Sequence, residues 1–225
     1  MNARHEPQQL DRSRHAGPQV FERLREAIVS LDLAPGTVLS RAELAGRFGL
    51  SQTPIRDALM RLGAEGLVDI FPQHATVVSR IDIASAKQAH FLRCSVELEV
   101  VRTLAENADA KVAARLLALI ERQRQALAAD DYAAFSAADR DFHREMYEAA
   151  GVDGLWRLVR SLSGHVDRLR RLHLPIAGKA EAVLDDHRGI VDAIARGDPE
   201  AAQRRLRRHL SGTLGKVDEI RLRFP

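Results

Sequence analysis

The sequence predicts a mainly α-helical protein of 225 residues, with strands confined to one short hairpin in its N-terminal third. Leu, Ala, Arg and Glu dominate the composition, and these residue types favour helices. Apolar residues recur at intervals of three and four over most of the chain, which is the period of a helix with one buried face. The pattern changes near residue 80, so two separate parts are expected.

Composition and charge exclude several classes of protein. No apolar stretch approaches the ~18 residues needed to span a bilayer, and the polar segment 1–18 lacks the apolar core of a secretory signal. The single cysteine, Cys94, cannot form an intramolecular disulfide and suits a reducing cytoplasm. The formal net charge of +3 is too small to indicate nucleic-acid binding by itself.

The first part opens with a segment that has no periodicity. Residues 1–17 are polar and are expected to form a mobile N-terminal arm. From Val20 onward apolar residues follow helical spacing, and the Pro35-Gly36 pair ends this first predicted helix because proline cannot continue it.

Two shorter helices are predicted next, each with its own start and stop signals. Ser40 can cap the second helix, which stops at Gly49. Ser51 can cap the third, where Pro54 falls in the first turn and costs little because its missing N–H would be unpaired there anyway. Gly66 ends this third helix.

Two short strands complete the first part. Residues 67–70 and 75–78 are rich in β-branched residues, and residues 71–74 connect them as a hairpin. Two short helices joined by a tight turn and followed by a hairpin make a winged helix-turn-helix, predicted over residues 18–79.

In this motif the second helix of the pair enters the major groove of duplex DNA with its first residues on the base edges. Gln52 and Arg56 can each bond a base in two places, whereas Thr53 suits phosphate. The predicted DNA-binding residues are Arg41, Arg47, Ser51, Gln52, Thr53, Arg56 and His74. Winged helices also dock other proteins, so this alternative stays open at this point.

After a predicted linker at residues 80–83, helical periodicity runs to Leu222. Turn residues interrupt it near 107–109, 130–131, 151–154, 175–178 and 197–199, which delimits about six helices. Short connections between amphipathic helices predict an antiparallel all-helical bundle over residues 84–222.

Four polar residues are predicted to face the interior of this bundle. Asp139 and His143 lie four residues apart and share a helix face with apolar residues, while His187 and His209 lie on the apolar stripes of two later helices. A buried carboxylate is costly unless it is paired or bound to a metal. One Asp and three His suit zinc, nickel or similar ions. For each His alone, a hydrogen-bonded core position is the alternative interpretation.

The remaining histidines are weaker candidates for this interior. His165 could face the same cavity, whereas His90 and His173 are expected at the surface or its boundary. The arginine run 204–208 is expected to be a solvated face.

Residues 24–82 resemble the N-terminal domain of the GntR family of bacterial regulators. The family's recognition helix usually begins Ser-Arg-Thr-Pro-(apolar)-Arg-Glu-Ala-Leu, and this chain has Ser-Gln-Thr-Pro-Ile-Arg-Asp-Ala-Leu at 51–59. Arg56 is kept, but Gln52 replaces the first arginine, Ala42 stands where an arginine is often found, and the wing has His74-Ala75 in place of Arg-Gly. The resemblance implies the fold, and these departures leave the operator sequence open.

The second part is similar to the ligand-sensing FCD domain of the FadR subgroup of that family. The matching motifs are Arg93-x-x-Val-Glu97, Asp139-x-x-Phe-His143, His187-Arg-x-Ile and Arg208-His209-Leu210. The resemblance implies an antiparallel bundle with a polar cavity that often holds a divalent metal, together with carboxylate effectors. The expected metal is zinc, with nickel or manganese as alternatives, and its expected ligands are Asp139, His143, His187 and His209.

These features predict a DNA-binding transcription regulator, in the first instance a repressor, whose operator binding a small carboxylate controls. A homodimer is expected because a two-fold dimer matches a palindromic operator. Arg93 is expected to clamp the effector carboxylate, with an ion pair to Glu97 as the alternative. The competing hypotheses are a metal-dependent enzyme with an accessory winged-helix domain, for which no nucleophile or general base stands out, and a regulator whose metal is purely structural.

Overall fold

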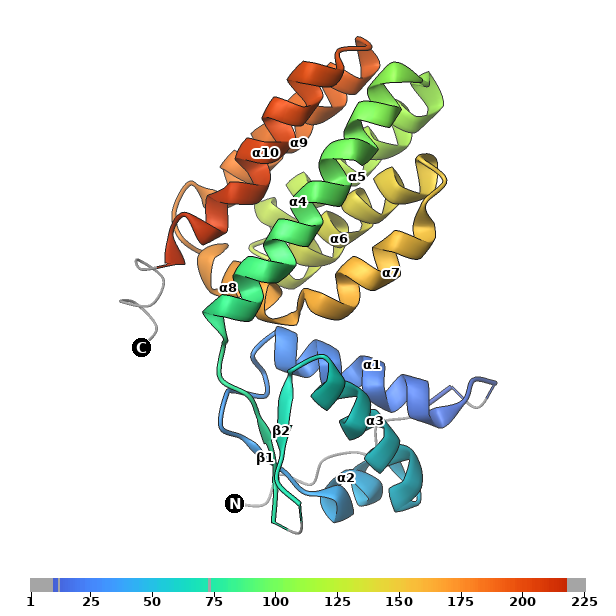
Figure 1. Cartoon of the computed structure of the whole chain (residues 1–225), viewed down its shortest axis with the longest axis vertical. Coiled ribbons are helices and arrows are strands. Elements are labelled where there is room, and N and C mark those ends of the chain that lie inside the picture. The colour runs from blue at the N-terminus through green and yellow to red at the C-terminus, as the bar shows by residue number, and fades with distance from the viewer. Residues whose placement is uncertain (1–9, 12, 73, 218–225) are drawn as a thin grey trace. The chain divides into compact units, whose positions relative to one another are not determined.

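The computed structural model describes residues 10–11, 13–72 and 74–217 and divides the chain into two compact units, Met1–Asp82 and Ile83–Pro225 (Figure 1). Helices dominate the described residues of both units, and the described strands all lie in the first unit. This confirms the predicted mainly helical fold with a small β-wing. None of the described helices is both long enough and apolar enough to cross a membrane.

The first unit holds three helices and three short strands among its described residues. Their order is α1 (Ala16–Val29), β1 (Val38–Leu39), α2 (Arg41–Phe48), α3 (Gln52–Ala64), β2 (Val68–Ile70) and β3 (Thr76–Val78). Strand β3 lies in the middle of the sheet, antiparallel to both β1 and β2, with Val77 opposite Val38 and Asp69. The two helices α2 and α3 with this sheet form the winged helix-turn-helix.

Two details of the first unit differ from the sequence prediction. Helix α1 begins at Ala16, inside the predicted arm 1–17 and before Val20, and the Gln19 side chain bonds both ways with the backbone of Asp11, at 2.8 Å each. Residues 1–9 and 12 of the predicted arm lie outside the described residues. Strand β1 was not predicted, because two residues cannot show the alternation that marks a strand.

The turn between α2 and α3 is built from backbone geometry. Ser40 caps α2 by accepting a hydrogen bond from the Glu43 N–H at 3.3 Å, as predicted. Ser51 stands at the N-cap of α3 with an extended backbone, but its side chain makes no capping bond, so that prediction was wrong. Gly49 adopts a left-handed φ of +64° that ends α2, and the Leu50 N–H then donates to the Ala45 carbonyl at 3.0 Å.

One hydrophobic core fixes α3 in the first unit. The apolar faces of α1 and α3 pack together and β2 closes the core from the side, through the fully or almost fully buried residues Val20, Leu24, Ile28, Ile55, Leu59, Leu62, Leu67 and Val68. Each such side chain contributes about 1.5–3 kcal/mol through burial. Packing on this face leaves the opposite face of α3 turned to solvent.

The second unit contains seven helices among its described residues. They are α4 (Ile83–Glu106), α5 (Ala110–Ala128), α6 (Tyr132–Ala149), α7 (Asp153–Leu162), α8 (Gly164–His173), α9 (Lys179–Ala195) and α10 (Pro199–Leu214). Helices α5 and α6 pack as one hairpin and α9 and α10 as another, while α4 runs along α10 (Figure 1). One continuous core, drawn from α4, α5, α6, α7, α9 and α10, fills the bundle.

The bundle has one helix more than the six predicted, because the chain divides at Ser163. No proline marks this point, and Ser163 keeps a helical backbone with φ −80° and ψ −6°. Its hydroxyl lies 2.7 Å from Asp167 Oδ2 and 3.0 Å from the Arg160 carbonyl, its single hydrogen can serve one of them at a time, and this local bonding competes with the helical ladder. A predicted linker residue, Ile83, is the first residue of α4.

We expect Gly49→Ala to weaken the winged helix by about 1 kcal/mol, because alanine is strained in the left-handed region. Gly46→Ala is the matched control: Gly46 lies in α2, its added Cβ would contact nothing, and alanine there favours the helix by up to about 1 kcal/mol. Hydrogen exchange of the α2 and α3 amides measures both effects. Equal protection in the two variants would contradict the assignment of Gly49 as the residue that ends α2.

Candidate metal centre and candidate nucleic-acid interface

Three helices bring four potential metal ligands together inside the bundle. Asp139 and His143 project from α6, His187 from α9 and His209 from α10, and all four are buried. One ligand atom from each residue lies within 4.8 Å of the ligand atoms of the other three. We call these four residues the His/Asp cluster. The residues predicted from helical spacing do meet at one point.

The local sequence explains why these polar groups face inward. Asp139 and His143 are one helical turn apart and share their face with the fully buried Phe142 and Met146. The imidazole of His187 stacks on the ring of Phe142 with centroids 4.0 Å apart, which fixes the plane of that imidazole.

Distances within the cluster match ligands around one ion. His209 Nε2 lies 3.2 Å from His143 Nε2 and 3.2 Å from His187 Nε2, and Asp139 Oδ1 lies 3.6 Å from His187 Nε2. Nitrogen ligands about 2.1 Å from a tetrahedral or octahedral ion are about 3.0–3.4 Å apart. His209 Nε2 carries at most one hydrogen, so it can donate to only one of the other two imidazoles. A cation at the centre would satisfy all three nitrogens.

A hydrogen bond behind His187 and a close carboxylate behind His143 orient two of the imidazoles. His143 Nδ1 lies 2.9 Å from Glu97 Oε2, and His187 Nδ1 lies 2.8 Å from Gln123 Oε1. The Gln123 acceptor places the ring hydrogen of His187 on Nδ1, and the negative charge of Glu97 favours the same tautomer in His143, so that both Nε2 lone pairs face the cluster. Sequence reasoning did not identify Gln123, although a polar residue on the apolar face of α5, between Ile120 and Ala126, was the available signal.

His209 is held less firmly than its two neighbours. Its Nδ1 lies 4.0 Å from Asp186 Oδ2, which is beyond hydrogen-bond distance. Asp186 itself accepts hydrogen bonds from the guanidinium of Arg208. The third imidazole therefore depends more on packing and on a central ligand than on a bond behind it.

The carboxylate of Asp139 has one satisfied oxygen and one oxygen without a partner. Arg170 donates to Oδ2 at 2.7 Å, whereas the buried Oδ1 has no hydrogen-bond partner among the described residues. A buried acceptor left unpaired costs about 1–3 kcal/mol. Since Oδ1 is the oxygen that faces the imidazoles, a divalent cation fits this donor set.

Burial and neighbouring charges shift the pKa values of the cluster residues in the direction that favours metal binding. Burial lowers the pKa of His187 to about 3 and also lowers the pKa values of His143 and His209. Burial acts in the opposite direction on Asp139 and is the largest single influence, but Arg170 together with His143, His187 and Arg93 outweighs it, and the pKa of Asp139 is lowered. At neutral pH the cluster therefore presents neutral imidazoles and one carboxylate, the protonation states that metal binding requires.

Arginines surround the cluster on one side. Arg93 on α4 is buried, and its Nε donates to Glu97 Oε1 at 2.6 Å, so the structure contains the ion pair that was the alternative to an effector clamp. Arg93 also lines a narrow pocket of only about 10 Å³ beside Asp139 and His143. The other residues that line this pocket are Arg140, Trp156, Val159, Arg160, Ser163 and Arg170.

The other histidines lie outside the His/Asp cluster. His165 is buried, and its Nδ1 lies 2.9 Å from the Arg168 guanidinium. His173, expected at the surface or its boundary, is buried instead, with Nδ1 3.3 Å from Thr213 Oγ1. His90 is half-buried, with Nε2 3.3 Å from Cys94 Sγ. The prediction for His173 was wrong because its burial depends on the packing of α8 against other helices, which include α4 and α10.

The predicted DNA-contacting residues gather on α2, on the start of α3 and on the wing. Arg47 is half-buried. The other six are exposed: Arg41, Ser51, Gln52, Thr53, Arg56 and His74. Arg56 has only a weak contact with Asp57, at 3.4 Å between two exposed side chains. Its guanidinium can therefore turn toward a ligand.

Acidification should destabilise the metal-free protein. The histidines of the cluster have lowered pKa values in the folded state, so below their ordinary value of about 6.5 the unfolded chain binds more protons than the folded one. Stability present above pH 6.5 is lost as the pH falls, by up to about 1.4 kcal/mol per pH unit for each histidine. Melting curves of chelator-treated protein between pH 7.5 and 5.5 measure this. A constant melting temperature over that range would refute the assigned protonation states.

Comparisons with known proteins identify the family. The model of bacterial regulatory proteins of the gntR family matches residues 17–78, and the FCD domain model matches residues 88–212. An uncharacterized HTH-type transcriptional regulator in an unstable DNA locus of Streptomyces ambofaciens is 36% identical, over 92% of this chain and 86% of that protein. The HTH-type transcriptional repressor RspR of Escherichia coli strain K12 is 30% identical, over 95% and 93% of the two chains.

Solved structures support the same assignment at the level of the fold. E. coli McbR/YncC has a TM-score of 0.79 at 22% identity, covering 94% of this chain and 100% of that chain. A GntR-type regulator from Rhodococcus sp. RHA1, described as putative, has a TM-score of 0.75 at 20% identity, covering 90% and 97%. The chain belongs to the gntR family of bacterial regulatory proteins: it is a DNA-binding transcription regulator rather than an enzyme, and its helical bundle is an FCD domain.

Proposed function

We propose that this protein is a repressor that binds a palindromic operator as a homodimer and that a small carboxylate, bound beside a divalent metal in the bundle, controls its affinity for DNA. The observation that carries the proposal is the His/Asp cluster, whose unpaired Asp139 Oδ1 and three converging Nε2 atoms call for a cation. Relatives described as repressors, such as RspR, support repression as the outcome.

Asp139, His143, His187 and His209 would hold the metal, and zinc is the ion that this donor set favours, with nickel or manganese as alternatives. When bound, the metal would supply positive charge at the inner end of the pocket, where a carboxylate can complete its ligand shell. Glu97 and Gln123 keep two of the imidazoles in the tautomer that leaves Nε2 free for metal.

The arginines of the narrow pocket would receive the effector. Arg93 bonds Glu97 through Nε, and a guanidinium has four further N–H donors at its other two nitrogens. Arg93 can therefore hold Glu97 behind His143 and still donate to a carboxylate in the pocket. The pocket is narrow in this structure, so an effector of several atoms has to displace some of the lining side chains.

At the other end of the chain, the exposed start of α3 would read the operator. Gln52 and Arg56 are placed to contact base edges, and Arg41, Ser51, Thr53 and His74 to contact the backbone or the minor groove. A homodimer would present two such helices to the two halves of a palindrome.

We expect His187→Asn to lower the metal content at least ~10-fold, because it removes one ligand and leaves the metal with three. His90→Asn is the control, since His90 lies outside the cluster and should keep full metal content. Elemental analysis of the purified variants gives the readout. Full metal content in His187→Asn would reject the proposed metal site.

The same pair of variants tests the control by carboxylates. Binding to a duplex carrying the protein's own promoter region is measured with and without a panel of small carboxylic acids. His90→Asn should respond to the active acid as the wild type does, whereas His187→Asn should bind the duplex and ignore every acid. If stripping the metal unfolds the bundle and no acid changes DNA binding in the wild type, the metal is structural and the proposed regulation is wrong.

Arg56→Ala should weaken binding to the promoter duplex by ~1–3 kcal/mol relative to random duplex, because it removes a contact that reads a base. Arg124→Ala on α5 is the control, since Arg124 is equally exposed and pairs only with its own helix through Glu121. Fluorescence anisotropy titrations at one fixed salt concentration provide the comparison. An unchanged preference for the promoter duplex would exclude Arg56 as a base-reading residue.

A further inference from the structure

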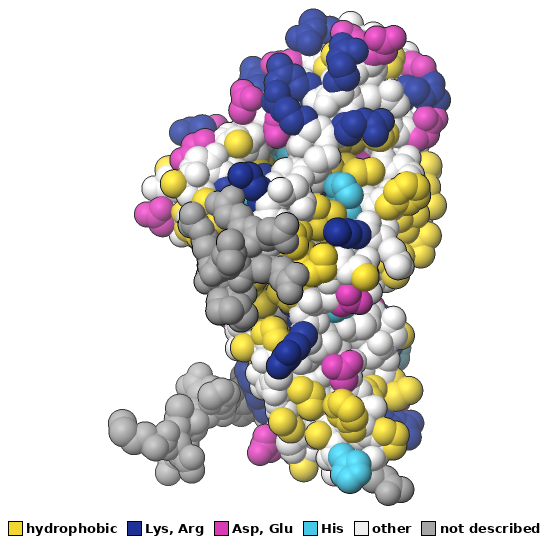
Figure 2. All heavy atoms as spheres, turned by 60° about the vertical axis from the view of Figure 1, so that its left-hand side comes forward, with side chains coloured by type: hydrophobic (Ala, Val, Ile, Leu, Met, Phe, Trp, Pro, Cys, Tyr) yellow, Lys and Arg dark blue, Asp and Glu magenta, His cyan; other side chains and the backbone are white. Residues whose placement is uncertain are grey.

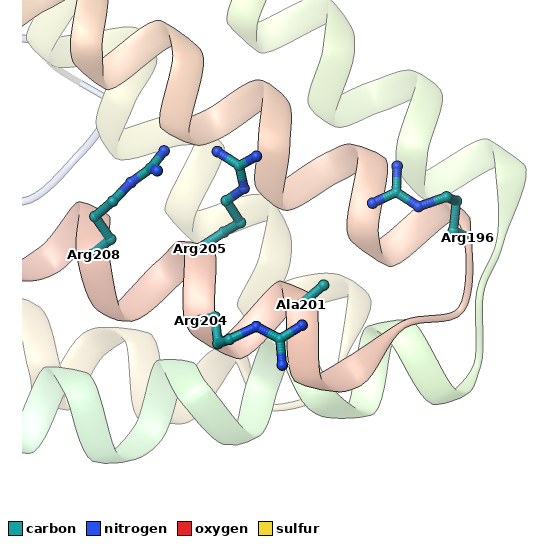
Figure 3. Close-up of a pocket in the computed structure, with 5 residues that line it drawn as sticks. All are labelled: Arg196, Ala201, Arg204, Arg205 and Arg208. Atoms are coloured by element: carbon teal, nitrogen blue, oxygen red, sulfur yellow. The ribbon is translucent and has the colours of Figure 1, made fainter.

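A second basic site lies on the outside of the bundle, away from the His/Asp cluster. The end of α9 and one face of α10 enclose a groove of about 450 Å³ lined by Arg196, Ala201, Arg204, Arg205 and Arg208 (Figure 3). We call it the arginine groove. Lys and Arg side chains gather over the upper part of the bundle, with Asp and Glu side chains between them (Figure 2). Among the described residues that line the groove itself, none is acidic.

The positions of the four arginines on α9 and α10 place them around the same groove. Arg204, Arg205 and Arg208 lie within about one turn of α10, and Arg196 is the C-cap residue of α9. Arg205 and Arg208 extend from α10 toward α9, and Arg204 extends along α10 toward Ala201 (Figure 3). Guanidinium groups from two helices thus line one groove.

Arg205 is held in position by a glycine of the neighbouring helix. A Cβ built on Gly189 in α9 would lie only 3.0 Å from Arg205 Nε and 3.1 Å from Arg205 Cζ. A glycine inside a helix costs about 1 kcal/mol relative to alanine, and here it lets Arg205 lie directly on the backbone of α9. The groove therefore contains a guanidinium that has lost part of its freedom before any ligand binds.

The present partners of Arg204 and Arg205 are weak enough to be exchanged, whereas Arg208 is held by hydrogen bonds to the largely buried Asp186. Arg204 lies 3.3 Å from Glu200, with 67% and 86% of the two side chains exposed, and Arg205 lies 4.0 Å from Asp185. Arg196 makes no ion pair with any residue that the structure describes. Exposed pairs of this kind contribute about 0–1 kcal/mol, whereas arginine binds phosphate oxygens through two parallel, charge-assisted hydrogen bonds.

We propose that the arginine groove binds a small phosphate polyanion, such as the oligophosphate group of a nucleotide. The groove of about 450 Å³ is larger than one orthophosphate, and the guanidinium groups of Arg196, Arg204 and Arg205, with Arg208 held on Asp186 beside them, match two or three linked phosphates. The groove spans only the C-cap of α9 and about two turns of α10, so its length suits a compact anion better than the backbone of a duplex. This site is distinct from the metal centre and from the pocket of the proposed carboxylate effector, although Arg208 links it to the metal centre through Asp186.

Arg208 must stay intact in the test, because it also bonds Asp186, the carboxylate beside His209. The test variant is therefore R204Q/R205Q in the full-length chain, and the probe is inorganic pyrophosphate titrated by calorimetry. The matched control is R122Q/R124Q, which removes two arginines of α5 that are 58% and 63% exposed and paired with acids. Pyrophosphate can also remove a bound metal ion. This effect should be the same in the wild type, R204Q/R205Q and R122Q/R124Q, because all three keep the metal ligands.

One pyrophosphate per chain should bind the wild type and R122Q/R124Q alike, and R204Q/R205Q should bind it at least about tenfold more weakly. R204K/R205K, which keeps the charges but loses the paired donors, should fall between them. Circular dichroism checks that every variant is folded. The metal-deficient His187→Asn variant should still bind pyrophosphate, which separates this site from the metal centre.

Three results would overturn the proposal. Absence of pyrophosphate binding at millimolar concentration would show that the groove is only a solvated face. Equal weakening in R204Q/R205Q and R122Q/R124Q would show a response to net charge alone. If R204Q/R205Q binds pyrophosphate normally but loses affinity for promoter duplex with a shallower salt dependence, the arginines contact DNA phosphates instead.

Discussion

The burial of three imidazoles and one carboxylate at a single point is the constraint around which the FCD domain is organised. Polar groups in a dry core are unfavourable unless each has a partner, so helices α4, α5 and α8 contribute Glu97, Gln123 and Arg170 to complete the set. At the centre of the cluster, one oxygen of Asp139 and the lone pairs of Nε2 atoms 3.2 Å apart still lack a partner. A divalent cation would supply it.

In the bundle, the ionisation of a buried side chain depends on the residues that pack around it. Glu97 has a pKa of about 2: burial alone would raise it, but Arg93 and His143 outweigh burial and keep the carboxylate ionised. The ion pair of Arg93 with Glu97 therefore does more than stabilise α4, since it maintains the acceptor that orients His143. An effector that engages Arg93 would act directly on that acceptor, which gives the proposed regulation a physical route into the metal centre.

The winged helix-turn-helix differs from the bundle, because most of its predicted DNA-contacting side chains are exposed to solvent. Its core holds α3 by one apolar face, and the left-handed Gly49 sets the turn that leaves the start of α3 exposed. The arginine groove on α9 and α10 shares this exposure, but there the guanidinium groups are brought together by close packing over Gly189. At both surfaces a glycine of the backbone, Gly49 or Gly189, helps to position the charged side chains.

Much of this could be predicted from the sequence, because helical period, capping residues and turn glycines are local properties. They determined the fold class, the placement of α2 and α3, and the inward faces that carry Asp139, His143, His187 and His209. Local properties fail where an element is too short or its cause lies elsewhere in the chain. Strand β1 is defined only by pairing with β3. The break at Ser163 has a local cause, bonds within four residues to Arg160 and Asp167, and the Ser163-Gly164 pair was the turn signal that the prediction missed.

Only the tertiary structure decided the partners of the polar residues. Gln123 behind His187, the burial of His173 against Thr213, and the seating of Arg205 over Gly189 join residues from 16 to 64 positions apart. The sequence by itself determined which faces of the helices turn inward, since that requires no more than the period of one helix. Which inward residues meet depends on how helices pack across the bundle, and no local pattern records that geometry.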